Sequence, residues 1–122
     1  MKLSVIGTGY VGLVSGTCLA DKGHDVICVD VDREKVERVN RGESPIFERG
    51  LQALLEKNAG KRLRATTDLE AAVRDTELTL IAVGTPFDGM AIDLRFIEQV
   101  SRQIGAALAA KSGYHVVVIK ST

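Results

Sequence analysis

The fold of this chain is decided near its N-terminus by the stretch Leu3-Ser4-Val5-Ile6-Gly7-Thr8-Gly9-Tyr10-Val11-Gly12. Its first four residues predict a short buried strand, and the glycines that follow have the spacing G-x-G-x-x-G. Apolar residues at helical spacing then predict a helix that begins near Tyr10 and stops at Gly23. Its inner stripe is expected to consist of Val11, Val14, Cys18 and Leu19. A strand, a glycine loop and a helix in this order are typical of a phosphate-binding turn.

Each glycine of the loop has a separate predicted role. Gly7 permits the tight turn out of the strand, Gly9 lets the backbone approach a pyrophosphate, and Gly12 allows close packing of helix against strand. The helix directs its free N–H groups and the positive end of its dipole at the phosphates. The alternative is a glycine-rich turn that binds nothing.

Asp30 ends the next predicted strand, where dinucleotide-binding folds carry a carboxylate for the adenosine ribose. A carboxylate there accepts the ribose hydroxyls and repels a 2′-phosphate, which favours NAD over NADP. Arg33 weakens this preference, because an arginine nearby accommodates a 2′-phosphate. The alternative role for Asp30 is a helix cap or a surface carboxylate, although Asp32 is better placed to cap the following helix.

Strands and helices are predicted to alternate along the rest of the chain. Further strands are expected at residues 25–30, 63–66, 78–83 and 115–119. Further helices are expected after Asp32, from about Leu51, after a capping box at Thr67, and after a cap at Asp93. This alternation predicts an α/β fold: a Rossmann-like doubly wound parallel sheet with strand order 3-2-1-4-5, truncated before the sixth strand. A ligand should then bind over the carboxyl ends of strands 1 and 4.

Two further groups of residues follow predicted strands at that same edge. Val83-Gly84-Thr85-Pro86 lies across the switch point from the glycine loop, which favours binding over a plain turn. The hydroxyls of Ser121 and Thr122 could orient a water or a cofactor group, although spacing alone favours a polar chain end. His24 and His115 have no catalytic partner at a recognisable spacing, so surface or structural roles are expected.

Composition limits the class of protein. The 122 residues have the usual size of one domain, and 16 Lys and Arg balance 16 Asp and Glu, which argues against a nucleic-acid binder. There is no apolar run of the roughly 20 residues that a membrane span needs. The two cysteines, Cys18 and Cys28, are expected to be buried and form neither a disulfide framework nor a metal cluster. A cytoplasmic protein with no metal, membrane or nucleic-acid partner is expected.

Four stretches, in the same order, resemble the N-terminal region of the UDP-glucose/GDP-mannose dehydrogenase family. They are residues 7–12, the run Gly42-Glu43-Ser44-Pro45-Ile46-Phe47-Glu48-Arg49-Gly50-Leu51, Val83-Gly84-Thr85-Pro86 with Asp93-Leu94, and Lys120-Ser121-Thr122. The Tyr10-Val11 pair and the S-P-I-[FY]-E-x-G-L pattern are far more specific than a glycine loop alone. The chain departs from the family at Arg49, where a proline is usual, and in a short loop at residues 87–92.

The resemblance implies an enzyme of nucleotide-sugar metabolism, as in polysaccharide biosynthesis. Family members use two NAD molecules to oxidise the C6 alcohol of a nucleotide sugar, here UDP-glucose or a related one, to a carboxylate. By resemblance, the NAD pyrophosphate would lie on Gly7, Thr8, Gly9, Tyr10, Val11 and Gly12. The adenosine ribose would lie on Asp30 with Lys35, and the nicotinamide side near Val83, Gly84, Thr85 and Pro86. Ser121 and Thr122 would help to hold the cofactor, and Thr122 would also support catalysis through a water.

The family's thiol nucleophile lies in a G-G-x-C-x-P-K-D stretch, which these residues do not contain, so no nucleophile is assigned. We therefore expect residues 1–122 to be the NAD-binding, N-terminal fragment of a larger homo-oligomeric enzyme, inactive by itself. Its fifth strand would have an open edge that invites pairing with another chain. The alternative is a stand-alone NAD-sensing regulatory module that acts on a partner protein. Another dehydrogenase class, of the 6-phosphogluconate or hydroxyacyl-CoA type, would share the glycine loop but not the pattern at residues 44–51.

Overall fold

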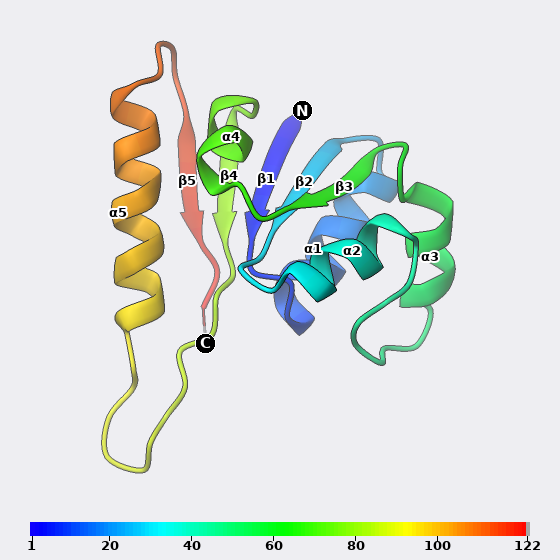
Figure 1. Cartoon of the computed structure of the whole chain (residues 1–122), viewed down its shortest axis with the longest axis horizontal. Coiled ribbons are helices and arrows are strands. Elements are labelled where there is room, and N and C mark those ends of the chain that lie inside the picture. The colour runs from blue at the N-terminus through cyan, green and yellow to red at the C-terminus, as the bar shows by residue number, and fades with distance from the viewer. Residues whose placement is uncertain (122) are drawn as a thin grey trace.

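The computed structural model describes residues 1–121, which form a parallel sheet with the order β3-β2-β1-β4-β5 and helices on its faces (Figure 1). The strands are β1 (Lys2–Ile6), β2 (Asp25–Val29), β3 (Leu63–Thr66), β4 (Leu78–Ile81) and β5 (Val116–Ile119). The helices are α1 (Tyr10–Asp21), α2 (Arg33–Asn40), α3 (Leu51–Asn58), α4 (Leu69–Arg74) and α5 (Arg95–Ala109). The predicted α/β fold and strand order are confirmed.

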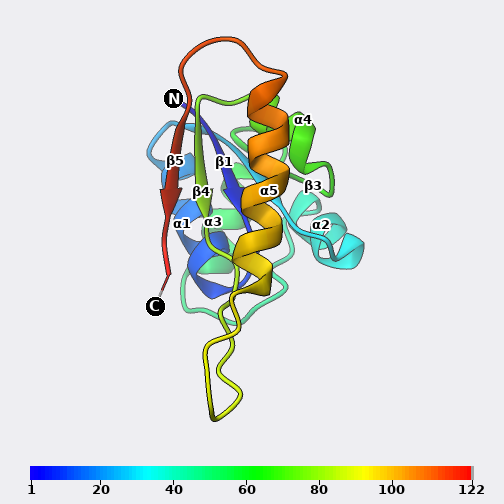
Figure 2. The ribbon, with the colours of Figure 1, turned by 90° about the vertical axis from the view of Figure 1, so that its left-hand side faces the viewer.

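The sheet separates two apolar cores. In β1, Val5 belongs to the core under α1, α2 and α3, whereas Ile6 belongs to the core under α4 and α5. Central parallel strands bury side chains on both faces in this way when helices cover both sides. The segment between β4 and α5 extends beyond the carboxyl end of the sheet (Figure 2). No helix within residues 1–121 is both long enough and apolar enough to cross a membrane.

The predicted inner stripe of α1 is only partly right: Val14 and Leu19 pack against the core, but they are not the most buried residues of the helix. The buried residues of this helix are Gly12, Leu13, Gly16, Thr17 and Ala20. Cys18, expected to be buried, is exposed. Small residues face the sheet because the helix lies very close to it: a Cβ on Gly16 would lie 3.0 Å from the Cys28 sulfur. Cys28 is buried as predicted, and this burial raises the pKa of its thiol to about 12, so the thiol stays unreactive.

The first turns of the helices show which predicted caps form. Asp32 caps α2 as predicted, because its carboxylate accepts from two backbone N–H groups of the first turn. The capping box at Thr67 is wrong: Asp68 is the N-cap of α4, so this helix begins one residue later than predicted. Asp93 is also not an N-cap, because Leu94 holds that position in α5. The Asp93 carboxylate nevertheless accepts from the backbone N–H of the helix's first residue, at 3.0 Å.

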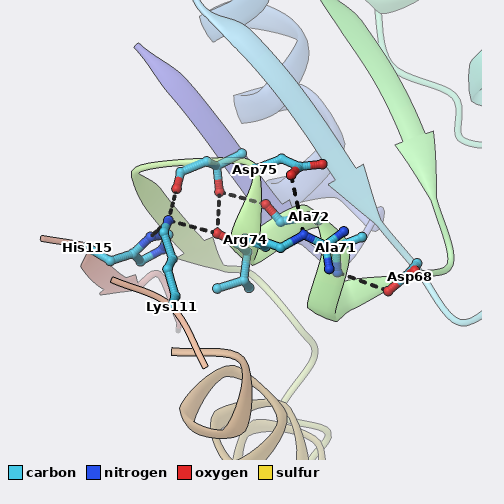
Figure 3. Close-up of polar contacts among 9 residues, drawn as sticks. Asp68, Ala71, Ala72, Arg74, Asp75, Lys111 and His115 are labelled. Atoms are coloured by element: carbon cyan, nitrogen blue, oxygen red, sulfur yellow. Dashed lines mark hydrogen bonds and ion pairs between the residues drawn. The ribbon is translucent and has the colours of Figure 1, made fainter. Parts of the chain in front are cut away.

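A series of hydrogen bonds joins β5 and α4 to the sheet. The Lys111 ammonium donates to His115 Nδ1 at 3.0 Å and to two backbone carbonyls at the end of α4 (Figure 3). An ammonium group only donates, so Nδ1 must accept, and the neutral ring carries its proton on Nε2. That Nε2 donates to Thr79 Oγ1 at 2.8 Å, and the Thr79 hydroxyl lies 2.7 Å from Ser4 Oγ. The structural role expected for His115 is confirmed.

The outer edge of β5 pairs with no strand within residues 1–121. Three apolar side chains on this strand are open to solvent: Val117 is 41% exposed, Val118 38% and Ile119 58%. Backbone N–H groups of Val116 and Lys120 donate to the β4 side, at 3.1 and 2.9 Å. Because N–H directions alternate along a strand, Val117 and Ile119 direct theirs outward. The strand therefore presents both apolar side chains and unpaired backbone groups.

His115 makes the stability of the chain depend on pH. Burial and the nearby Lys111 charge lower the pKa of His115 below its usual value of 6.5. The folded state therefore binds a proton less readily than the unfolded state, so this group lowers stability as the pH falls below 6.5 and has no effect above it. We expect the melting temperature to fall between pH 7 and pH 5, with a smaller fall in His115→Gln. An NMR titration of the ring that placed its pKa at or above 6.5 would contradict this.

Candidate functional site

The carboxyl ends of β1, β2 and β4 meet at an open groove of about 580 Å³. Most of the predicted binding residues line it: Gly7, Thr8, Gly9, Asp30, Lys35, Val83, Gly84, Thr85 and Pro86. Tyr10, Val11 and Gly12 lie in the first turn of α1 behind the loop, and they are not among the lining residues. Ser121 is exposed beyond the end of β5, and Thr122 lies outside the described residues. Parallel strands thus bring distant segments to one edge.

The three loop glycines are required for different physical reasons. Gly7 has φ +103°, and a Cβ there would lie 2.8 Å from the carbonyl oxygen of Ala82. A Cβ on Gly12 would lie 1.9 Å from the carbonyl oxygen of Gly7, so only glycine fits at this contact. Gly9 has φ −74°, and a Cβ on it would meet no heavy atom of the described residues within 4 Å. Neither backbone conformation nor internal packing demands glycine at position 9, which leaves close approach of a ligand as the reason.

The start of α1 offers backbone donors for which residues 1–121 supply no acceptor. Its N-cap, Gly9, makes no side-chain cap hydrogen bond, whereas the N-cap residues of α2 and α4 do so through aspartates. The first N–H groups of an α-helix have no partner within the helix and carry the positive end of its dipole. Placed beside the open position of Gly9, these donors suit a phosphate group.

Asp30 is held in place at the end of β2. Its Oδ2 accepts from the Thr8 hydroxyl at 2.6 Å and from the Thr8 N–H at 3.0 Å, and its Oδ1 accepts from the Asp32 N–H at 2.9 Å. Burial raises the pKa of Asp30, but the hydrogen bonds from Thr8 and Asp32 together lower it by more. The pKa of Asp30 therefore lies below its usual range. The charge of Lys35 acts in the same direction. The carboxylate is therefore ionised at neutral pH and faces the groove.

A smaller, mostly apolar hollow of about 160 Å³ adjoins the groove beside Asp30. Sequence reasoning did not identify the residues that line it on its helical side: Thr67, Leu69, Phe96, Gln99 and Gln103. Phe96 is the most informative of these, because it lines both the hollow and the groove and is 49% exposed. The signal that could have found it is a large aromatic residue in the first turn of the helix that follows β4.

Another hollow, of about 630 Å³, lies at the opposite, amino end of the sheet. Its lining includes four basic residues, of which three lie close together in the sequence: Lys61, Arg62, Arg64 and Arg74. Arg62 already pairs with Asp25 at 3.4 Å. None of the predicted site residues line this hollow, and it lacks a glycine loop. We therefore place the functional site at the carboxyl edge.

Two glycine substitutions separate binding from folding. We expect Gly9→Ala to keep stability within about 1 kcal/mol, because its φ suits alanine. Its affinity for NAD should fall at least about tenfold, since the added methyl group occupies space that the pyrophosphate needs. The matched variant Gly12→Ala should lose about 1–3 kcal/mol of stability through overpacking. Thermal melts and calorimetric NAD titrations measure both effects, and unchanged affinity in folded Gly9→Ala would contradict the assignment.

Comparison with known proteins shows the family to which the chain belongs. The family model described as "UDP-glucose/GDP-mannose dehydrogenase family, NAD binding domain" matches residues 1–122. The whole chain aligns with 28% of a UDP-glucose 6-dehydrogenase from Rhizobium meliloti at 50% identity, and with 28% of a GDP-mannose 6-dehydrogenase from Pseudomonas aeruginosa at 47%. It also superposes on 28% of a GDP-mannose dehydrogenase in a ternary complex from Pseudomonas aeruginosa, with a TM-score of 0.96 and 47% identity. The chain therefore belongs to the UDP-glucose/GDP-mannose dehydrogenase family and corresponds to its NAD-binding domain.

Proposed function

We propose that this chain is the cofactor-binding domain of an NAD-dependent enzyme that oxidises the C6 alcohol of a nucleotide sugar to a carboxylate. The observation that carries the proposal is Gly9, because neither its backbone conformation nor its packing requires a glycine. It lies beside the start of α1, which has no side-chain cap, and near the ionised Asp30. An open backbone and free N–H groups fit a pyrophosphate, and a carboxylate fits ribose hydroxyls.

The lining residues would hold NAD in an extended pose across the groove. The pyrophosphate would lie on the loop at Gly9 and the first turn of α1, and the adenosine ribose on Asp30 with Lys35. The adenine would enter the apolar hollow beside Phe96. The nicotinamide side would lie toward Gly84 and Thr85, where a Cβ on Gly84 would meet no heavy atom of the described residues within 4 Å. Bound NAD supplies a hydride acceptor.

We further propose that residues 1–122 form one domain of a longer enzyme. The chain spans 28% of the length of the relatives it matches. Its thiols fit no nucleophilic role here, because Cys28 is buried with a raised pKa, and Cys18 lies on α1 and is not among the groove residues. A catalytic thiol and a sugar-binding site would then come from outside these residues. Both cysteines are free, which fits the reducing cytoplasm.

UDP-glucose is the substrate we propose for the complete enzyme. The relative at 50% identity is a UDP-glucose 6-dehydrogenase. GDP-mannose is the second candidate, supported by the relative at 47% identity. NADH formation by the complete enzyme, with the two nucleotide sugars supplied in parallel, distinguishes them: faster turnover of GDP-mannose would overturn the first choice.

The isolated chain should bind NAD without turning over a sugar. We expect calorimetry to detect weak NAD binding, because contacts from the rest of the enzyme are missing. We expect no rise of NADH absorbance when NAD and UDP-glucose are both present. NADH production by the pure chain would contradict the proposal that the catalytic thiol and the sugar-binding site lie outside these residues. Binding of another nucleotide in place of NAD would contradict the cofactor assignment.

The open edge of β5 is the surface through which we propose that the chain associates. Unpaired strand edges with apolar side chains pair readily with a second chain. We expect sedimentation velocity to show concentration-dependent association, and Ile119→Pro to abolish it, because that N–H faces outward and contributes nothing to the β4 pairing. The control Val118→Pro removes an inward N–H and should destabilise the fold. A wild-type chain that stays monomeric at millimolar concentration would contradict this.

A further inference from the structure

Thr8 occupies an unexpected place for a residue in a phosphate-binding loop. Although glycines flank it on both sides, its side chain is fully buried. Its hydroxyl lies beneath the loop and donates to Asp30 Oδ2 at 2.6 Å. The backbone N–H of Thr8 donates to the same oxygen at 3.0 Å. Two donors of one residue therefore hold one carboxylate oxygen, and the Thr8 hydroxyl proton is already used in this contact.

The remaining oxygen of Asp30 is the one available to a ligand. Oδ1 accepts only the Asp32 N–H, at 2.9 Å, among the described residues. A carboxylate offers about four acceptor positions, two on each oxygen, so Oδ2 is filled and Oδ1 retains one. A ribose hydroxyl would donate to this Oδ1 position. The carboxylate therefore presents a single acceptor in a single orientation.

The fixed carboxylate counteracts the attraction that nearby cations would have for a 2′-phosphate. Arg33 and Lys35 both lie in the first turn of α2, which closely follows Asp30 in the sequence, and the charge of Lys35 acts on the Asp30 carboxylate. Arginine or lysine at this place could attract a 2′-phosphate if the carboxylate rotated aside. With Oδ2 held by Thr8, rotation would break two hydrogen bonds to a partly buried charged group, and such bonds are among the strongest in proteins.

We infer that Thr8 is a positioning residue that sets the preference for NAD over NADP, by holding the Asp30 carboxylate where it accepts a ribose hydroxyl and repels a 2′-phosphate. The inference rests on the proposed NAD-binding function. It assigns to a buried hydroxyl a role in choosing between two cofactors that differ by one phosphate group.

Thr8→Val tests this, because valine keeps the shape and the backbone N–H but removes the hydroxyl. Calorimetric titrations with NAD and with NADP give the ratio of the two dissociation constants. We expect NAD binding to weaken about tenfold and NADP binding to stay equal or tighten, so that the preference falls about tenfold or more. Thr8→Ser, which keeps the hydroxyl, should retain the wild-type ratio within about twofold.

Two further measurements keep the outcome interpretable. An NMR titration of the Asp30 carboxyl should show its pKa rising in Thr8→Val and returning toward the wild-type value in Thr8→Ser. If Thr8→Val does not fold, Thr8→Ala takes its place with the same expected ratio. An unchanged ratio of the NAD and NADP dissociation constants in a folded variant, including an equal loss of both affinities, would overturn the role of Thr8. It would leave the proposed NAD-binding function intact. A wild-type chain that binds neither dinucleotide would overturn the proposed function itself.

Discussion

The contact between Gly12 and the carbonyl oxygen of Gly7 is the constraint on which the rest of the site depends. A Cβ at position 12 would lie only 1.9 Å from that oxygen, so the first turn of α1 touches the loop that leaves β1. This contact places the free N–H groups of the helix directly above the strand end. It also allows the small inner face of α1, with Gly16 and Ala20, to lie close against the sheet. The groove exists because helix and strand approach so closely.

The two ends of the sheet differ in whether their polar groups are bonded within the protein or available to a ligand. At the carboxyl end, Asp30 and the uncapped helix leave polar groups available to a ligand. At the amino end, hydrogen-bonding groups are paired internally: Thr79 Oγ1 bonds to both Ser4 and His115, and Lys111 closes the end of α4. Buried polar groups stabilise a fold only when they have partners, and this network joins β5 to the rest of the sheet. Internal hydrogen bonds thus fix the amino ends of β4 and β5, whereas polar groups at the carboxyl edge remain available to a ligand.

Much of the fold could be predicted from the sequence, because most strands and helices carry a local signal, although residues 63–66 carry only a weak one. The order of the sheet and the convergence of the glycine loop, Asp30 and Gly84 follow from general rules for parallel sheets. Hydrophobicity alone does not predict the inner face of α1, because the close approach of helix and sheet places Gly12, Gly16 and Ala20 there beside Leu13. Phe96 and the bond between Thr8 and Asp30 join distant segments, and local patterns carry no information about such contacts.

We propose that the carboxyl edge of the sheet binds NAD, with the pyrophosphate over Gly9. An amide NMR titration of residues 1–122 with NAD tests it most directly, because every backbone N–H of the loop reports separately. We expect the largest shifts at Gly9, at the first turn of α1, and at Asp30 and Gly84. Shifts concentrated instead around Arg64 and Arg74, at the opposite end of the sheet, would contradict it.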